Sequence, residues 1–148
     1  LEFAKEREQF GRPIAEFQGL QWMLADMSVQ IEAARSLLHK AALSAGQNGS
    51  PFPDPTLAAQ GKIFTSEMAL KVTNDALQMF GARGYSRNYP MERLARDARM
   101  FTIGGGTAQI LRTVVASRIL EMKLPQTREG FLQMAEREAS EKSLQAAE

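Results

Sequence analysis

The sequence predicts an all-α protein: an up-down four-helix bundle with an extra helical tail. Apolar residues recur at alternating steps of three and four along several segments, as they do on one face of an amphipathic helix. Short loops rich in glycine and proline separate these segments, which is typical of a bundle whose neighbouring helices run antiparallel. No segment alternates apolar and polar residues as a strand does. We predict a bundle domain at residues 1–123 and a charged tail at residues 124–148.

The composition excludes several classes of function. The chain has 148 residues, a net charge of +1, no cysteine and a single histidine. Disulfides and thiolate chemistry are therefore excluded, no histidine-based metal site is expected, and no overall charge favours nucleic acid. No apolar run is long enough to cross a membrane, and the charged N-terminus is not a signal peptide. The first residues look like the middle of a helix, as they would in a piece of a longer chain.

The first two predicted elements are the end of a helix and a long helix. Residues 1–9 are expected to finish a helix, which Gly11 and Pro13 interrupt. The next helix is the clearest in the sequence, and it ends in the glycine- and proline-rich loop at residues 46–53. Its apolar seam consists of Phe17, Leu20, Leu24, Met27, Ile31, Ala34, Leu38 and Ala41.

The second long helix is expected to begin at Asp54 or Thr56, with Pro55 in its first turn. Its apolar face consists of Ile63, Phe64, Met68, Val72, Ala76 and Met79. Gly81 is expected to end it, and a polar loop follows at residues 82–89.

Two shorter helices complete the predicted bundle. One spans about residues 90–99. The three glycines at residues 104–106 then exclude a helix, because each costs about 1 kcal/mol relative to alanine in a helix interior. Thr107 can cap the last bundle helix, which ends before Pro125.

The side chains offer little catalytic chemistry of their own. The sequence contains no nucleophile–histidine pair and no Walker-type phosphate loop. Its glycine-rich turns lie next to helix starts, where exposed backbone N–H groups favour anions and partial negative charge. With arginine, glutamine and threonine nearby, such turns can hold a phosphorylated cofactor or an enolate-like oxygen.

Three segments resemble the C-terminal helical domain of FAD-dependent acyl-CoA dehydrogenases. They are Glu-Arg-Glu-Gln-Phe-Gly-Arg-Pro-Ile at residues 6–14, Gln-Met-Phe-Gly-Ala-Arg-Gly-Tyr at residues 78–85, and Gly-Thr-Ala-Gln at residues 106–109. The resemblance covers residues 1 to about 123. One departure is Ala82, which replaces a family glycine and puts a close backbone contact in doubt.

The resemblance implies that FAD is the cofactor and that it lies across a contact between two subunits. Arg7 and Gln9 would contact the FAD pyrophosphate of a neighbouring subunit, with Phe10 and Gln18 lining the same site. The adenosine half and the region near the pyrophosphate would be held by a second set, which consists of Gln78, Gly81, Thr107 and Gln109.

Gly105 occupies the position where many family members carry the catalytic glutamate, so the chain itself supplies no catalytic residue. Gly106 would donate its N–H to the thioester carbonyl, and Gly105 would leave space for the acyl chain. The missing base leaves three alternatives open. It lies upstream of Leu1, as in isovaleryl-CoA and long-chain acyl-CoA dehydrogenases; a paired subunit supplies it; or the protein is a relative that does not dehydrogenate acyl-CoA, such as a flavin monooxygenase or a DNA-associated homologue.

The resemblance thus implies an enzyme that oxidises acyl-CoA to trans-2-enoyl-CoA as part of a longer chain, the 148-residue piece being inactive by itself. Its expected partners are acyl-CoA, an electron-transfer flavoprotein and further copies of itself in a dimer or tetramer. The expected location is the bacterial cytoplasm, in preference to a mitochondrial matrix. A purely oligomerising helical module is the competing hypothesis.

Overall fold

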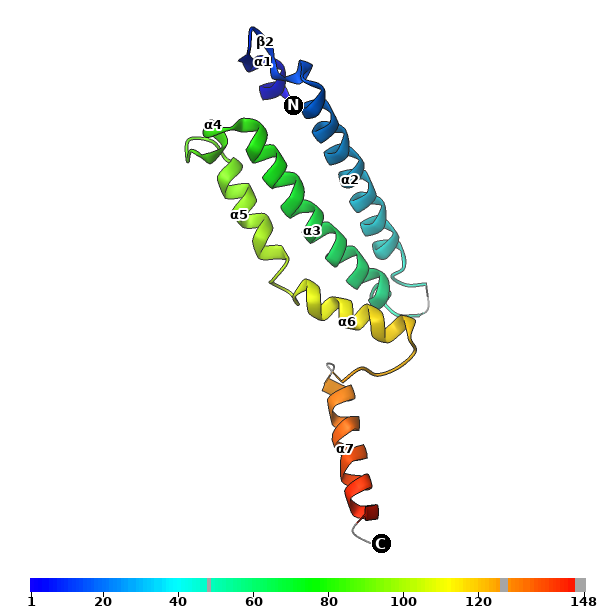
Figure 1. The fold of residues 1–148 in the computed structure, drawn as a ribbon. Helices are drawn as coiled ribbons and strands as arrows, with labels where there is room; N and C mark the ends of the chain where they lie inside the picture. Colours follow the sequence, from blue (N-terminus) through cyan, green and yellow to red (C-terminus); the bar gives the residue numbers. More distant parts are fainter. Residues whose placement is uncertain (48, 126–127, 146–148) are drawn as a thin grey trace.

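The computed structural model describes residues 1–47, 49–125 and 128–145, and it confirms the all-α bundle (Figure 1). The central helix α3 lies between α2 on one side and the pair α5 and α6 on the other. Helices α2, α3 and α5 run antiparallel in sequence order, and α6 continues from α5 across the first half of α3. The four bundle helices are α2 (Gln18–Leu43), α3 (Pro55–Phe80), α5 (Met91–Phe101) and α6 (Ala108–Ile119).

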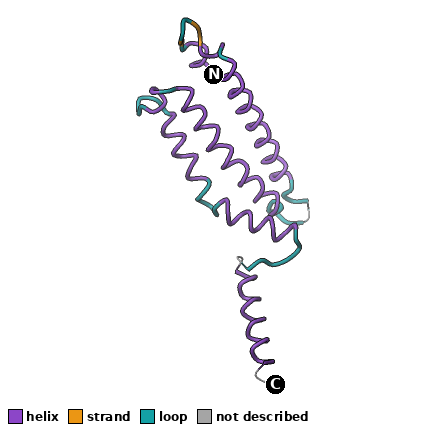
Figure 2. The backbone as a smooth tube through the Cα atoms, in the orientation of Figure 1, coloured by secondary structure: helices purple, strands orange, loops and turns teal. Residues whose placement is uncertain are grey.

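The N-terminal segment differs from the prediction. Helix α1 spans only Glu2–Glu6, and a small antiparallel hairpin follows it, with β1 at Glu8–Gln9 and β2 at Arg12–Pro13 (Figure 2). Phe10 and Gly11 form its turn with φ of 52° and 74°. Two successive residues with positive φ are what a two-residue type I′ turn requires. The prediction that the first helix extends to residue 9 is therefore wrong.

A short 3-10 helix, η1 (Ile14–Glu16), connects the hairpin to α2. The extended backbone of Phe17 then separates η1 from α2, which begins one residue later than the predicted seam.

The predicted start and end of α3 are confirmed. The Asp54 carboxylate accepts a hydrogen bond from the Leu57 N–H at 2.9 Å, and Pro55 is the first helical residue. Gly81 ends the helix with φ 58° and ψ −138°, a conformation that favours glycine. The predicted polar loop after it instead begins with a short helix, α4 (Ala82–Tyr85).

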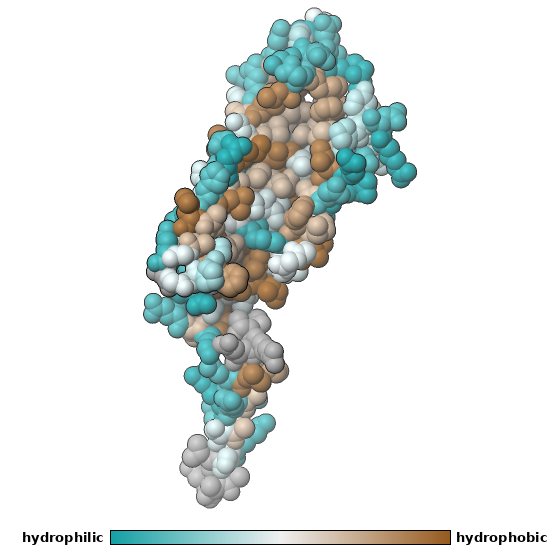
Figure 3. Space-filling model, turned by 180° about the vertical axis from the view of Figure 1, so that it is seen from behind, coloured by the Kyte–Doolittle hydropathy of each residue, from teal (hydrophilic) through white to brown (hydrophobic). Residues whose placement is uncertain are grey.

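Small residues bring α2 and α3 together. Gly61 of α3 is buried, and a Cβ placed on it would lie 3.7 Å from a methyl group of Leu38 on α2. Apart from Met27, the large residues of both predicted seams are only partly covered, and apolar surface is visible across the bundle from behind (Figure 3). The buried residues of the two helices are Met27, Ala34, Ala41, Ala59, Gly61 and Ser66.

The predicted tail forms helix α7 (Arg128–Gln145), which extends away from the bundle (Figure 1). Its apolar side chains Phe131, Leu132 and Met134 are exposed. Residues 126–127 and 146–148 of the predicted tail lie outside the described part. Within the described ranges, none of the helices combines the length and apolar character that crossing a membrane requires.

Candidate functional site

The residues predicted to bind FAD and the substrate lie in two groups at different positions along α3. The hairpin-end group surrounds the end of α3 near Gly81, and the glycine-loop group lies beside Lys62. These positions are 19 residues apart in one helix, which at about 1.5 Å per residue is roughly 28 Å. The hairpin-end group consists of Arg7, Gln9, Phe10, Gln18, Gln78 and Gly81, and the glycine-loop group of Gly105, Gly106, Thr107 and Gln109.

Three members of the hairpin-end group line one cavity of about 270 Å³. They are Arg7, Gln9 and Gly81. Backbone hydrogen bonds fix Arg7 on both sides: its N–H donates to the Phe3 carbonyl at 2.8 Å, and its carbonyl accepts from the Ile14 N–H at 2.8 Å. The unpredicted hairpin thus holds the half-buried Arg7 at the edge of the cavity.

Aromatic rings and a second arginine border the same cavity. The rings of Phe3 and Phe80 stack with centroids 4.0 Å apart, and the Tyr89 ring meets Phe80 edge-on at 6.2 Å. The Arg83 guanidinium lies 5.9 Å from the centre of the Phe3 ring. Arg7 and Arg83 both line the cavity, and a pair of arginines is suited to binding a diphosphate.

The other three members of the hairpin-end group lie outside this cavity. Phe10 is 92% exposed at the tip of the hairpin, where its ring contacts the edge of Phe17. Gln18 and Gln78 are exposed at the start of α2 and in the last turn of α3. Their side chains are available to a ligand or a second copy that approaches from outside.

The structure shows why the segment at residues 78–85 has glycine at positions 81 and 84. The positive φ belongs to Gly81, whereas Ala82 is helical, so its methyl group causes no backbone strain. A Cβ on Gly81 would meet nothing within 4 Å, which leaves its backbone open to a ligand. A Cβ on buried Gly84 would lie 2.6 Å from the Leu77 carbonyl oxygen, so Gly84 is required for packing.

The glycine-loop group forms a closed turn between α5 and α6. The Ala108 N–H donates to the Thr102 carbonyl at 3.0 Å. Gly105 and Gly106 both have positive φ, 68° and 92°. The Thr107 hydroxyl accepts from the Ile110 N–H at 3.2 Å, so the predicted cap is confirmed.

The turn presents backbone N–H groups to a ligand. Among the described residues, no backbone carbonyl accepts from the N–H groups of Gly105, Gly106 and Thr107. Gln109 is exposed in the first turn of α6. Unpaired donors at a helix start are suited to binding a phosphate or a thioester oxygen. Together with the arginine-lined cavity of the hairpin-end group, they are compatible with binding FAD and acyl-CoA.

Lys62 contacts this turn, although no motif in the sequence predicted this contact. Its ammonium group donates to the Phe101 carbonyl at 2.5 Å and to the Gly106 carbonyl at 2.8 Å. The one feature of the sequence that could have indicated this role is that Lys62 directly precedes Ile63 and Phe64, two residues of the apolar face of α3.

An ion pair that was likewise not predicted from the sequence joins α3 to α6 near the turn. The Arg112 guanidinium donates to the Glu67 carboxylate at 2.7 Å. This hydrogen bond holds the pKa of Glu67 below its ordinary value and raises that of Arg112. Since Arg112 lies one turn beyond Ala108, the pair keeps the start of α6 against α3.

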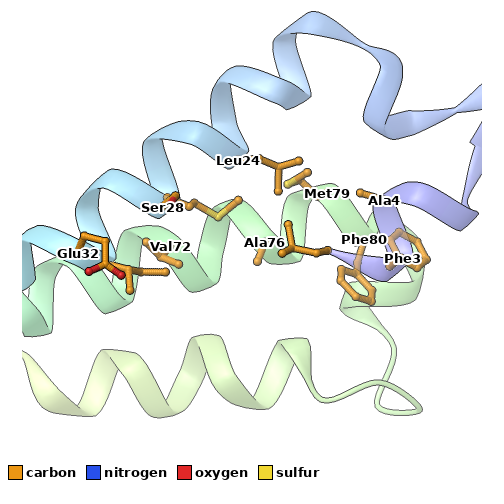
Figure 4. Close-up of a pocket in the computed structure, with 12 residues that line it drawn as sticks. Phe3, Ala4, Leu24, Ser28, Glu32, Val72, Ala76, Met79 and Phe80 are labelled. Atoms are coloured by element: carbon orange, nitrogen blue, oxygen red, sulfur yellow. The ribbon is translucent and has the colours of Figure 1, made fainter. Parts of the chain in front are cut away.

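A separate apolar groove of about 320 Å³ runs between α1, α2 and α3 (Figure 4). Leu24, Val72 and Met79 line it, with Glu32 at one end. It contains none of the predicted site residues and lacks basic side chains. Within the described part of the chain, no group of histidine, cysteine and acidic residues could hold a metal ion.

Comparisons with known proteins place this architecture in a family. The model of the acyl-CoA dehydrogenase C-terminal domain matches residues 1–120. A 3-sulfinopropanoyl-CoA desulfinase from Advenella mimigardefordensis is 69% identical over 134 residues, which cover 90% of this chain and 32% of that protein. A short-chain acyl-CoA dehydrogenase from Clostridium acetobutylicum is 44% identical, over 79% of this chain and 30% of that protein.

A solved structure agrees with these relatives. Butyryl-CoA dehydrogenase from Megasphaera elsdenii matches with a TM-score of 0.74 and 44% identity, over 80% of this chain and 30% of that one. The chain thus spans about a third of the length of the proteins it matches. Its matched segment, its helix arrangement and its identity to these relatives show that it belongs to the acyl-CoA dehydrogenase family, as a C-terminal domain.

Proposed function

We propose that this chain is the C-terminal domain of an FAD-dependent enzyme that removes the sulfinate group from 3-sulfinopropanoyl-CoA. The observation that carries the proposal is the identity of 69% to a desulfinase of that substrate, against 44% to the dehydrogenase. Gly105 agrees with it, because desulfination does not require a carboxylate at this position and a carboxylate would repel the anionic sulfinate.

The proposed reaction balances without an external oxidant. The bond between the sulfinate sulfur and C3 breaks, and C3 gains a proton to give propanoyl-CoA. The sulfur gains the oxygen of one water and leaves as sulfite. An electron-transfer flavoprotein is therefore not a partner in this reaction.

FAD is proposed as the cofactor on the strength of the two groups described above. Arg7 and Gln9 would hold its pyrophosphate and Gly81 its adenosine half, while Thr107 and Gln109 would contact it from the glycine loop. When bound, FAD would supply a ring that can accept electrons. Gly106 would orient the thioester by donating its N–H to the carbonyl oxygen.

The distance of roughly 28 Å along α3 supports a site shared between two copies. The copies would form a dimer or a tetramer, and the exposed apolar side chains of the bundle are suited to such contacts. A bacterial cytoplasm is the proposed location, since the relatives named above are bacterial.

A second candidate is α,β-dehydrogenation of an acyl-CoA, which the family membership favours. Its base would come from the longer protein, because Gly105 cannot accept a proton from the α-carbon. This reaction would require an electron acceptor such as an electron-transfer flavoprotein.

The two candidates differ in their products. Full-length protein loaded with FAD and given 3-sulfinopropanoyl-CoA without an electron acceptor is expected to release sulfite and propanoyl-CoA in equal amounts. Enoyl-CoA formation that needs an acceptor, with no sulfite released, would contradict desulfination and support the second candidate.

Replacing Gly105 with glutamate is expected to lower sulfite release by about tenfold or more relative to Gly105→Gln. Both variants add a side chain at the same positive φ, so both carry a similar strain of about 1 kcal/mol. They differ in charge, and only the carboxylate repels the sulfinate. Steady-state sulfite release measures the ratio, and equal rates would show that the sulfinate does not lie near residue 105.

A further inference from the structure

We propose that Lys62 is a positioning residue that holds the glycine turn in the conformation in which the Gly106 N–H can bind the thioester. This rests on the proposed function of the glycine loop. Lys62 lies in α3, whereas its two acceptors belong to the last residue of α5 and to the residue before the cap of α6. One ammonium group thus joins three helices at the turn.

The hydrogen bond to Gly106 determines the orientation of a whole peptide unit. The Gly106 carbonyl and the Thr107 N–H belong to the same planar trans peptide, so they point in opposite directions. While Lys62 holds the carbonyl toward α3 at 2.8 Å, the Thr107 N–H is directed away from α3. Fixing this peptide also restricts ψ of Gly106, and so the direction of the Gly106 N–H, the proposed thioester donor, relative to α3.

This turn needs an external constraint because glycine is conformationally free. Gly105 and Gly106 can adopt positive or negative φ at similar cost, so neither residue by itself keeps the observed 68° and 92°. Besides Lys62, the turn is held by the Ala108–Thr102 backbone bond and by the Thr107 cap. Neither of these bonds involves the Gly106 carbonyl.

The second bond of Lys62 fixes where its charge lies. Phe101 is the last residue of α5, where helix carbonyls lack partners within the helix and the dipole favours a cation. Bonded there, the ammonium remains beside the turn, so its charge also favours partial negative charge on a bound oxygen. Lys62 therefore holds the donors in place and adds to the positive potential at the thioester.

The test compares Lys62→Met, Lys62→Arg and the control Lys71→Met in the full-length FAD-loaded protein. Lys71 is an exposed lysine of the same helix that pairs with Asp75. Displaced binding groups can cost on the order of 10²-fold in rate, so kcat for sulfite release should fall by about that factor in Lys62→Met. Lys62→Arg keeps a cation and hydrogen-bond donors, so it should recover most of the lost kcat. Lys71→Met should have the same kcat as the parent.

A binding measurement separates this proposal from the proposed reaction. Propanoyl-CoA is titrated into each protein, and its Kd is read from the change in flavin absorption. Lys62→Met should raise the Kd threefold or more, whether or not the parent releases sulfite. A Kd changed by less than threefold would overturn the positioning role, as would a lower Tm with kcat unchanged. Absence of sulfite from the parent alone would instead count against desulfination.

Discussion

Replacing Gly84 with alanine is expected to destabilise the bundle by about 3 kcal/mol, the upper range for an added methylene in a packed core. The new Cβ would lie 2.6 Å from the Leu77 carbonyl oxygen and 2.7 Å from the Phe80 Cβ. Neither atom is the end of a flexible side chain, so α4 would have to move away from α3. Urea unfolding of the chain, followed by far-UV circular dichroism, measures the loss.

Gly19→Ala is the matched control for this change. Gly19 is an exposed residue of α2, and a Cβ there would meet nothing within 4 Å. Its free energy of unfolding should stay within about 1 kcal/mol of the parent, on the stabilising side, because alanine favours a helix. If both variants unfolded at the same urea concentration, the close packing of Gly84 against α3 would be wrong.

Replacing Arg7 with alanine in the full-length protein is expected to raise the Kd for FAD by about 10- to 100-fold. A hydrogen bond to a charged group contributes about 1.5–3 kcal/mol, and a guanidinium can form two with a pyrophosphate. Arg7→Lys should recover only part of the affinity, because lysine lacks the planar pair of donors. Flavin fluorescence titration measures the three values.

Arg35→Ala is the control for Arg7. Arg35 is an exposed arginine of α2 that pairs with Glu32, remote from both predicted groups. Its loss should leave FAD binding unchanged. If the Arg7→Ala protein had the same Kd for FAD as the parent, the cavity at the hairpin end would not be part of the cofactor site.

The starts of α3 and α6 and the end of α3 were predictable because they depend on neighbours in the sequence. The Asp54 and Thr107 caps each bond an N–H three residues away, and Gly81 ends α3 through its own φ. The hairpin at residues 8–13 was not predictable by alternation, because its two strands have two residues each. It depends on Phe10 adopting a positive φ that few non-glycine residues adopt.

The contacts that shape the glycine loop were not predictable because they join distant residues. Lys62 reaches carbonyls 39 and 44 residues away, and Arg112 pairs with Glu67 across 45 residues. Periodicity identified the apolar faces of α2 and α3 but not how closely the helices approach. That distance depends on Gly61 and the alanines between the large side chains.

The FAD content of mixed oligomers tests most directly whether the hairpin-end group of one copy and the glycine-loop group of another copy build one flavin site. Full-length Arg7→Ala and Gln109→Ala proteins, carrying different tags, are produced together and purified through both tags. In a one-to-one oligomer, one site of each pair carries both substitutions and the other carries neither. FAD content should therefore reach about half that of the parent, at an FAD concentration that leaves each single variant nearly empty. Mixed oligomers with no more FAD than the single variants would contradict the shared site.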